Sequence, residues 1–403
     1  MTLNRRPQPS SDDRELRLWK VGRALVVTFA AAVLVAGGVF YSLLYLLDFQ
    51  EIDSTAKLDA KTLFDLVKLS FGVVAGAGAL VALVVAYRRQ RVDEVGAHRE
   101  ATRLHTERFS VAVDKLGSDS PAVRLGGVHA LAGLADDAPD NNLRQTCIDV
   151  LCAYLQLPFT PDPGDDPAHQ EEHHRYLALR KVRHTILRLI GDHYRRPQGT
   201  RRSWQGCNLD LTGVTIDGRI DFNGATFSVG GEVFFDGATF SVGGEVSFND
   251  ATFSDGGWLS FRGAEFSGSD VTFNRARFSG GTVAFDAATF SRGRVFFRRA
   301  TFSGSRVFFG GASFSGSRVS FDGATFSGGT VTLREATRSD GGVFFHGATF
   351  SGGRVAFDDA TFSGGTVSFR DATGPAPSGL LTGVGTPTSV SIILSSAWLG
   401  SNP

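Results

Sequence analysis

The stretch FDGATFSGGTV, Phe321–Val331, decides the fold, because close copies of it occur before and after it. Examples are FFDGATFSVGGEV at 234–246 and FHGATFSGGRV at 345–355. The shared template is V-x-F-x-x-A-x-F-S-G-G-x. Its alanine recurs from Ala225 to Ala372 with a period of about 13 residues at first and about 12 residues later, and a degenerate copy starts at Leu209. A fixed short period over fourteen units predicts a solenoid.

The template also predicts which side chains form the core. V-x-F and A-x-F alternate in the manner of β-strands, with apolar residues on one side. S-G-G supplies residues that suit a corner, so Gly328 and Gly329 are expected to turn the chain in the opening stretch. The expected inward residues of two central copies are Phe285, Ala288, Phe290, Phe321, Ala324 and Phe326.

These residues resemble the pentapeptide-repeat family, in which a small residue stands two places before a central Leu or Phe. Ala225 with Phe227 and Val233 with Phe235 fit that signature. The resemblance implies a right-handed quadrilateral β-helix at 206–373. The chain departs from the family by adding two or three residues after each pair of pentapeptides. We therefore expect a coil of about 24 residues from two units; one unit per coil is the alternative.

Some outward positions predict a partner surface. Threonine fills most places between the alanine and the second Phe, which suits strands, although threonine ladders also occur in ice-binding proteins. Outward aromatic residues cost solubility unless they are covered, so they indicate a possible binding surface. The candidates are Phe234, Phe296, Phe308 and Phe344, with Arg294, Arg306 and Arg318 nearby in sequence.

The family's best-understood activity, mimicry of DNA that inhibits gyrase, would require a strongly acidic rod. The segment 209–373 holds 17 acidic residues and 14 arginines, with acids concentrated early and arginines later. The whole chain is neutral, with 41 basic and 41 acidic residues. This balance argues against DNA mimicry, and no nucleic-acid partner is expected.

Two uncharged stretches near the N-terminus predict transmembrane helices at 24–47 and 69–87, since about 20 apolar residues span a bilayer. Segment 1–23 and the residues just after 87 are rich in Arg, whereas the loop 48–68 is also acidic. The positive-inside rule then places both termini in the cytoplasm of a bacterial cell. The expected partner is the lipid bilayer and the expected location is the plasma membrane.

Segment 88–205 is expected to be a helical adaptor. A weak heptad stripe, Val92, Val95, Thr102, Phe109, Val113 and Leu116, raises the possibility of a homodimer through the helix that follows the second span. The basic helix 175–196 could face anionic lipids or simply cap the next domain. HQEEH at 169–173 does not match the zinc-protease motif. The tail 374–403 could add a last strand and shield the end of the stack.

No motif indicates catalysis. We find no nucleophile paired with a base, no P-loop and no set of metal ligands, so no catalytic, cofactor-binding or metal site is expected. The sequence favours a membrane-anchored, non-catalytic scaffold at the cytoplasmic face that binds an unidentified protein. A two-span signal transducer is the first alternative, and a gyrase-binding DNA mimic is the second.

Overall fold

The computed structural model describes residues 60–376 and 391–399, except 161, 165, 229, 242, 243, 339 and 363, together with seven isolated positions between 27 and 41. The chain divides into two units, Met1–Glu100 and Ala101–Pro403. Most of the predicted segments 1–23, 24–47 and 48–68 lies outside the described residues.

Helix α2 (Ala60–Leu116) is a single helix of 57 residues. It contains the second predicted span, 69–87, and continues through the polar residues beyond it. Within the described part of the chain, no helix has both the length and the apolar character needed to cross a membrane. The prediction of two transmembrane helices is therefore not supported.

After α2 the chain forms α3 (Pro121–Asp136), α4 (Asn141–Gln156) and, after the 3-10 turn η2 (Pro167–His169), α5 (Gln170–Tyr194). Two of them, α3 and α4, begin where the sequence has capping residues. Ser120 is the N-cap of α3 with proline next to it, and the Asp140 side chain accepts a hydrogen bond of 2.9 Å from the Leu143 backbone N–H.

The heptad stripe on α2 splits into two parts with different surroundings. Leu116 is buried, and Phe109 and Val113 pack against the core of the second unit. Val92 and Val95 remain exposed. The C-terminal half of the stripe is therefore used within the chain, which leaves only the N-terminal half for a second copy.

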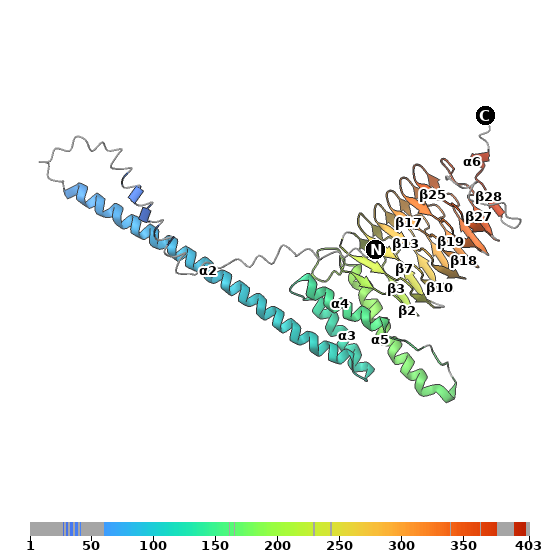
Figure 1. Cartoon of the computed structure of the whole chain (residues 1–403), viewed down its shortest axis with the longest axis horizontal. Coiled ribbons are helices and arrows are strands. Elements are labelled where there is room, and N and C mark those ends of the chain that lie inside the picture. The colour runs from blue at the N-terminus through green and yellow to red at the C-terminus, as the bar shows by residue number, and fades with distance from the viewer. Residues whose placement is uncertain are drawn as a thin grey trace, which may run out of the picture. The chain divides into compact units, whose positions relative to one another are not determined.

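The strands of the second unit form a parallel β-solenoid of four sheets, whose coils are coloured from yellow-green to red in Figure 1. Sheet A, in spatial order, contains β1 (Leu209–Asp210), β5 (Glu232–Phe234), β9 (Trp258–Ser260), β13 (Thr282–Ala284), β17 (Arg306–Phe308), β21 (Thr330–Thr332) and β25 (Arg354–Ala356). Sheet B contains β2 (Thr215–Ile216), β6 (Thr239–Phe240), β10 (Glu265–Ser267), β14 (Thr289–Ser291), β18 (Ser313–Ser315), β22 (Thr337–Arg338) and β26 (Thr361–Phe362).

The other two sheets complete each coil. Sheet C contains β3 (Arg219–Asp221), β7 (Glu245–Ser247), β11 (Asp270–Thr272), β15 (Arg294–Phe296), β19 (Ser317–Ser320), β23 (Gly341–Phe344), β27 (Thr366–Ser368) and β28 (Ser391–Ile393). Sheet D contains β4 (Thr226–Phe227), β8 (Thr252–Phe253), β12 (Arg277–Phe278), β16 (Thr301–Phe302), β20 (Thr325–Phe326) and β24 (Thr349–Phe350). The chain visits A, B, C and D in turn, so A lies opposite C, and B opposite D.

The register of these sheets shows that one coil contains two repeat units. Val283 pairs with Val307, and Phe302 pairs with Phe326, so each residue lies on its counterpart two repeat units further along. The stack has about seven such turns, with seven strands in sheet A. The prediction of four faces from two units is confirmed, and the alternative of one unit per coil is wrong.

Stacked phenylalanine rings fill the interior of the solenoid. In one column Phe278, Phe302 and Phe326 lie 4.7 and 4.8 Å apart between ring centroids, with planes within 5° of parallel. This spacing equals the usual separation of paired strands, so each ring sits directly on the ring of the next coil. The residues Phe285, Ala288, Phe290, Phe321, Ala324 and Phe326 are all fully buried in this core.

The corners of the coil use glycine for two different reasons, positive φ and close packing. In Phe321–Ala324 the Ala324 backbone N–H donates to the Phe321 carbonyl at 2.9 Å, and Gly323 between them has a φ of +65°. Gly328 and Gly329 do not have positive φ. Their role is close packing, since a Cβ would lie 2.7 Å from Ser303 O and 3.0 Å from Ser305 O respectively. The chain passes from β20 of sheet D to β21 of sheet A through Ser327–Gly329, so the prediction that S-G-G turns the corner in this copy is confirmed, although neither glycine does so through a positive φ.

One irregular unit interrupts two ring columns without interrupting the sheet. Leu333 replaces a phenylalanine and is buried. Arg338 replaces another, and its backbone pairs with Phe314 on one side and Phe362 on the other. The expectation that this face bulges or opens near Arg338 is therefore wrong for the backbone, because main-chain hydrogen bonds do not depend on the side chain.

Both ends of the solenoid are covered by other parts of the second unit. At the first coil, the Tyr194 ring of α5 lies 5.8 Å from Phe222 and 5.7 Å from Phe227. At the last coil, β28 pairs with β27, and Trp398 of α6 (Ser396–Leu399) lies 5.4 Å from Phe369. Exposed strand edges invite further pairing, so these caps leave mainly the side faces available to partners.

Candidate functional site

The predicted partner residues divide between two opposite faces of the solenoid. Four lie on sheet C: Arg294, Phe296, Arg318 and Phe344. The other three lie on sheet A: Phe234, Arg306 and Phe308. A single surface made of all seven is excluded by this arrangement.

On sheet C the phenylalanine rings are paired with arginines. The Arg298 guanidinium carbon lies 4.2 Å from the Phe296 ring centroid, and Arg294 lies 5.5 Å from the same ring. One coil further on, Arg318 lies 4.2 Å from the Phe344 ring. Guanidinium groups stack favourably on aromatic faces. We call Arg294, Phe296, Arg298, Arg318, Phe344 and His346 the Arg–Phe face.

The rings on this face lie over small neighbours in the strand ladder. Phe296 pairs with Thr272 and Ser320, and Ser320 pairs in turn with Phe344. Ser320 is fully buried, and only 9% of Phe296 is exposed. A Cβ on Gly342 would lie 1.8 Å from the Phe344 ring, so this ring folds back over its own strand. The outward rings are therefore partly covered by their own sheet.

Carboxylates lie beside two arginines of this face, Arg294 and Arg318. Arg294 Nε donates to Asp270 Oδ1 at 2.8 Å, and a second bond joins the same two side chains. This bidentate pair raises the pKa of Arg294. Arg318 and His346 both approach Asp322, at 3.8 and 3.7 Å. The arrangement presents ordered cationic edges beside partly covered aromatic rings.

Sheet A offers a weaker site. Phe234 and Phe308 are half-buried and are separated along the ladder by Ser260 and Ala284. Because two strands lie between them, the two rings do not form one patch. Arg306 is exposed on the same strand as Phe308.

The basic helix α5 is occupied largely in capping the solenoid. Asp217, in the first coil, accepts bonds from Arg180 Nε at 2.7 Å and Tyr176 Oη at 3.2 Å, and pairs with His184 Nε2 at 2.9 Å. Burial raises the pKa of Asp217, but hydrogen bonds from His184 and Arg180 outweigh it and lower the pKa to about 2. These contacts favour the capping role of the helix over a lipid-facing one.

Another contact of α5 comes from a buried arginine. Arg183 donates to the Leu155 carbonyl at 2.8 Å and to the Thr215 carbonyl at 3.0 Å. Burial lowers the pKa of this guanidinium. The side chain thus connects α4 to the first coil through α5.

Outside the solenoid, the cysteines are buried and several histidines pair with carboxylates. Burial raises the pKa of Cys147 and Cys152 to about 12, and it also raises that of Cys207. His169 pairs with Glu172, and His173 with Asp162. Among the residues that the structure describes, no group of three or more His, Cys, Asp or Glu side chains is placed to hold a metal ion.

Sequence reasoning missed two members of the Arg–Phe face, Arg298 and His346. Both occupy the place directly after the first Phe of their units, two coils apart. Residues that are two repeat units apart lie on neighbouring coils, so Phe296, Ser320 and Phe344 belong to one ladder. The expected coil length was therefore sufficient to find this ladder, and the missing signal was the direction in which the arginine side chains lie.

Comparison with known proteins adds little to this picture. No protein-family profile matches the chain, and no curated protein matches it. Among solved structures, the chain is similar to a trypsin-treated variant of QnrB1, described as a plasmid-mediated fluoroquinolone resistance protein. The identity is 15%, the match covers 44% of this chain and 89% of that one, and the TM-score is 0.13. A TM-score this low supports no argument about function, so the fold rests on the strand register described above.

Proposed function

We propose that this protein is a non-catalytic binding protein whose β-solenoid recognises a protein partner through the Arg–Phe face. The observation that carries the proposal is the pairing of three arginines with two aromatic rings on β15 and β23, the two strands that flank β19 in sheet C. Arginine and aromatic side chains are enriched at the energetic centres of protein interfaces.

The expected partner presents carboxylates to this face. Arg298 is exposed, and 43% of the Arg318 side chain is exposed, so both can form further charge-assisted bonds. The underlying rings supply apolar area that is already ordered, which reduces the entropy lost on binding. Arg294, held by Asp270, contributes mainly to the shape of the surface.

Crosslinking from defined faces tests this proposal. A photoreactive amino acid replaces Arg298 in the turn that follows β15 of sheet C, Phe308 on sheet A, or Thr301 on sheet D, in full-length protein expressed in cells. We expect one protein adduct from position 298, and we expect Arg318→Glu to reduce it by about tenfold. Equal adducts from Thr301, or an adduct that Arg318→Glu leaves unchanged, would contradict a role for this face.

We also infer that the solenoid is a variant of the pentapeptide-repeat fold. Support comes from the four faces of each coil and from the inward position of the small residue and the central Phe, as at Ala288 and Phe290. The longer coil is the main departure. Deleting one full coil, 283–306, should leave a folded, shorter solenoid, whereas deleting 283–294 should not, because half a coil would place sheet A strands against sheet C.

A second candidate function, signal transduction, is favoured by the length of α2, which runs without a break from Ala60 to Leu116. Its exposed Val92 and Val95 would form the contact in a homodimer. Disulfide formation by a Val95→Cys variant would support that reading if a Val111→Cys variant did not crosslink. A monomer by light scattering at high concentration would argue against it.

The location of the protein is a separate proposal that rests on the sequence alone. The uncharged stretches and the flanking arginines lead us to propose the plasma membrane, with both termini in the cytoplasm. Recovery of the full-length chain in the membrane fraction after washing at high pH tests this proposal. Release into the supernatant would refute it.

A further inference from the structure

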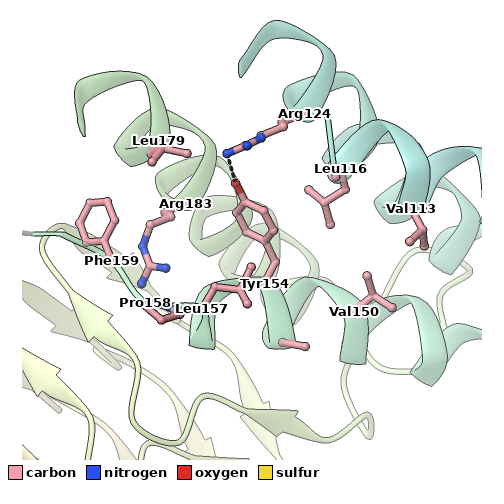
Figure 2. Close-up of a pocket in the computed structure, with 12 residues that line it drawn as sticks. Val113, Leu116, Arg124, Val150, Tyr154, Leu157, Pro158, Phe159, Leu179 and Arg183 are labelled. Carbon is pink, nitrogen blue, oxygen red and sulfur yellow. Dashed lines mark hydrogen bonds between the residues drawn. The ribbon is translucent and has the colours of Figure 1, made fainter. Parts of the chain in front are cut away.

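The helical part of the second unit contains a groove with no part in the proposed function. It has a volume of about 460 Å³ and lies among the end of α2, α3, α4 and α5. Aliphatic side chains form its wall, as Figure 2 shows for Val113, Leu116 and Val150. At its mouth Leu157 is 56% exposed. This volume lies in the range of small-molecule sites, which is about 300–1,000 Å³.

Arg183 lines this groove and carries an unused hydrogen-bond donor. Only 4% of the residue is exposed, and both terminal nitrogens donate to backbone carbonyls. Its Nε finds no hydrogen-bond partner among the described residues. The Phe159 ring covers the guanidinium at 4.6 Å, so a small rotation of that ring would open Nε to the groove. An unpaired buried donor is costly and favours an acceptor that enters from outside.

A second cation reaches into the same groove. The half-buried Arg124 of α3 extends to the Tyr154 hydroxyl of α4 at 3.4 Å, drawn as a dashed line in Figure 2. At that distance the bond is weak, and a carboxylate would compete with it successfully. No acidic residue is among the described residues that line the groove. Its electrostatic character is therefore positive over an apolar wall.

We propose that this groove binds a free fatty-acid anion. The alkyl chain would lie along the aliphatic wall, and the carboxylate would accept hydrogen bonds from Arg124 and, after the Phe159 ring moves, from Arg183. An anionic head with an apolar chain matches the wall and the two cations together. A cationic or uncharged polar ligand would leave one of these features unsatisfied.

Photolabelling of the full-length protein tests this inference. The probe is myristate with a diazirine in its chain, and the labelled peptides are identified by mass spectrometry. We expect labelling within 113–117 or 150–159, competed by plain myristate but not by tetradecanol, which has the same chain without the charge. Phosphatidylglycerol vesicles serve as the arm for a lipid surface and should not compete.

Two kinds of variant give the test its specificity. Leu157→Glu places a carboxylate at the mouth of the groove, and we expect labelling to fall by about tenfold. Leu177→Glu is the matched control, because Leu177 is also an exposed leucine but does not line the groove. It should change labelling by less than about twofold. Arg124→Gln should weaken competition by myristate several-fold, and tetradecanol should still fail to compete.

Three outcomes would overturn the inference. Equal loss of labelling in Leu157→Glu and Leu177→Glu would show that the groove is not the site. Predominant labelling of exposed α2 residues such as Leu83 would show unspecific adsorption. Competition by tetradecanol as strong as that by myristate, or by the vesicles alone, would show that a free carboxylate is not recognised. Unchanged fluorescence of the buried Trp204 confirms that each variant is folded.

Discussion

The β-solenoid and the helices that cap it are stabilised in different ways. In the solenoid the same contact recurs once per coil, so that Phe278, Phe302 and Phe326 repeat one stacking arrangement. In the helical part single side chains make unique connections, as Arg183 does between Leu155 and Thr215. Removing one side chain from a series of repeated contacts should destabilise the neighbouring coils and leave distant ones intact. Removing a side chain that makes a unique contact should instead separate whole elements.

The largest expected effect comes from opening the ring column. Phe302→Ala removes a fully buried ring between two stacked neighbours, and we expect a loss of about 3–5 kcal/mol in the free energy of unfolding. Hydrogen exchange should accelerate in the adjoining coils and not in α3 or α4. Phe302→Leu, which keeps most of the volume, should cost clearly less. Uniform acceleration over the whole second unit would mean that the solenoid does not behave as a chain of local contacts.

A unique contact in the helical part should show the opposite pattern. Arg183→Met leaves two buried carbonyls without a donor, and we expect a loss of about 2–4 kcal/mol. Because the pKa of Cys147 and Cys152 is raised to about 12, native protein should react slowly with iodoacetamide near neutral pH. The variant should expose both thiols, while exchange in the central coils stays unchanged.

The control for this contact is Arg188→Met. The Arg188 side chain is 58% exposed, and its ion pair among the described residues is an i,i+4 pair with Asp192, so its loss should lower the free energy of unfolding by less than about 0.5 kcal/mol. Equal thiol exposure in both variants would show that charge on α5, and not the buried bonds, holds the helix to the solenoid.

The contact between α5 and the first coil of the solenoid, which is centred on Asp217, should weaken in acid. The pKa of Asp217 is about 2 in the folded protein and about 3.9 in an unfolded chain. A lowered pKa stabilises the fold fully above the unfolded value, and this stabilisation is lost as pH falls from about 4 towards 2. This stabilisation amounts to about 2–3 kcal/mol.

The measurement is the difference in unfolding free energy between wild type and Asp217→Asn as a function of pH. This difference should be greatest above about pH 5 and should shrink below about pH 4, because the variant cannot lose a charge that it lacks. A difference that is constant over this range would show that the carboxylate charge does not stabilise the contact between α5 and the solenoid.

The smallest expected effect concerns the corners. Ala287 and Gly323 occupy equivalent corner positions and both have positive φ, +55° and +65°. We expect Ala287→Gly to stabilise and Gly323→Ala to destabilise the protein, each by about 1 kcal/mol, measured by chemical denaturation. Changes of the same sign in both variants would show that backbone strain is not the controlling factor at these corners.

Much of the solenoid could be predicted because its information is local and repeated. The alanine spacing alone indicates the number of units, and the apolar alternation indicates the inward residues such as Phe285 and Ala288. The corner at Gly328 and Gly329 was predicted correctly, but the reason for glycine there is close packing and not a positive φ. In sequence, a glycine needed for its φ and a glycine needed for close packing look the same, and only the neighbouring coil distinguishes them.

The candidate sites depended on contacts that no local pattern contains. Sequence reasoning selected Phe296 and Phe344 as outward, but it could not place Arg298 and Arg318 over their rings. It described α5 as basic without finding that Arg180 and His184 meet on Asp217. The groove was missed entirely, because Arg124 and Arg183 come from different helices.

The sequence by itself determined that this chain forms a repeated, strand-based stack with a phenylalanine core, since a period with inward apolar residues can bury its side chains only by stacking on itself. The tertiary structure decided which outward residues share a face, which glycines need a positive φ and which arginines face a groove. These properties depend on contacts between residues that lie one coil or one helix apart. Such contacts arise from the way the chain folds back on itself, and local propensity does not encode them.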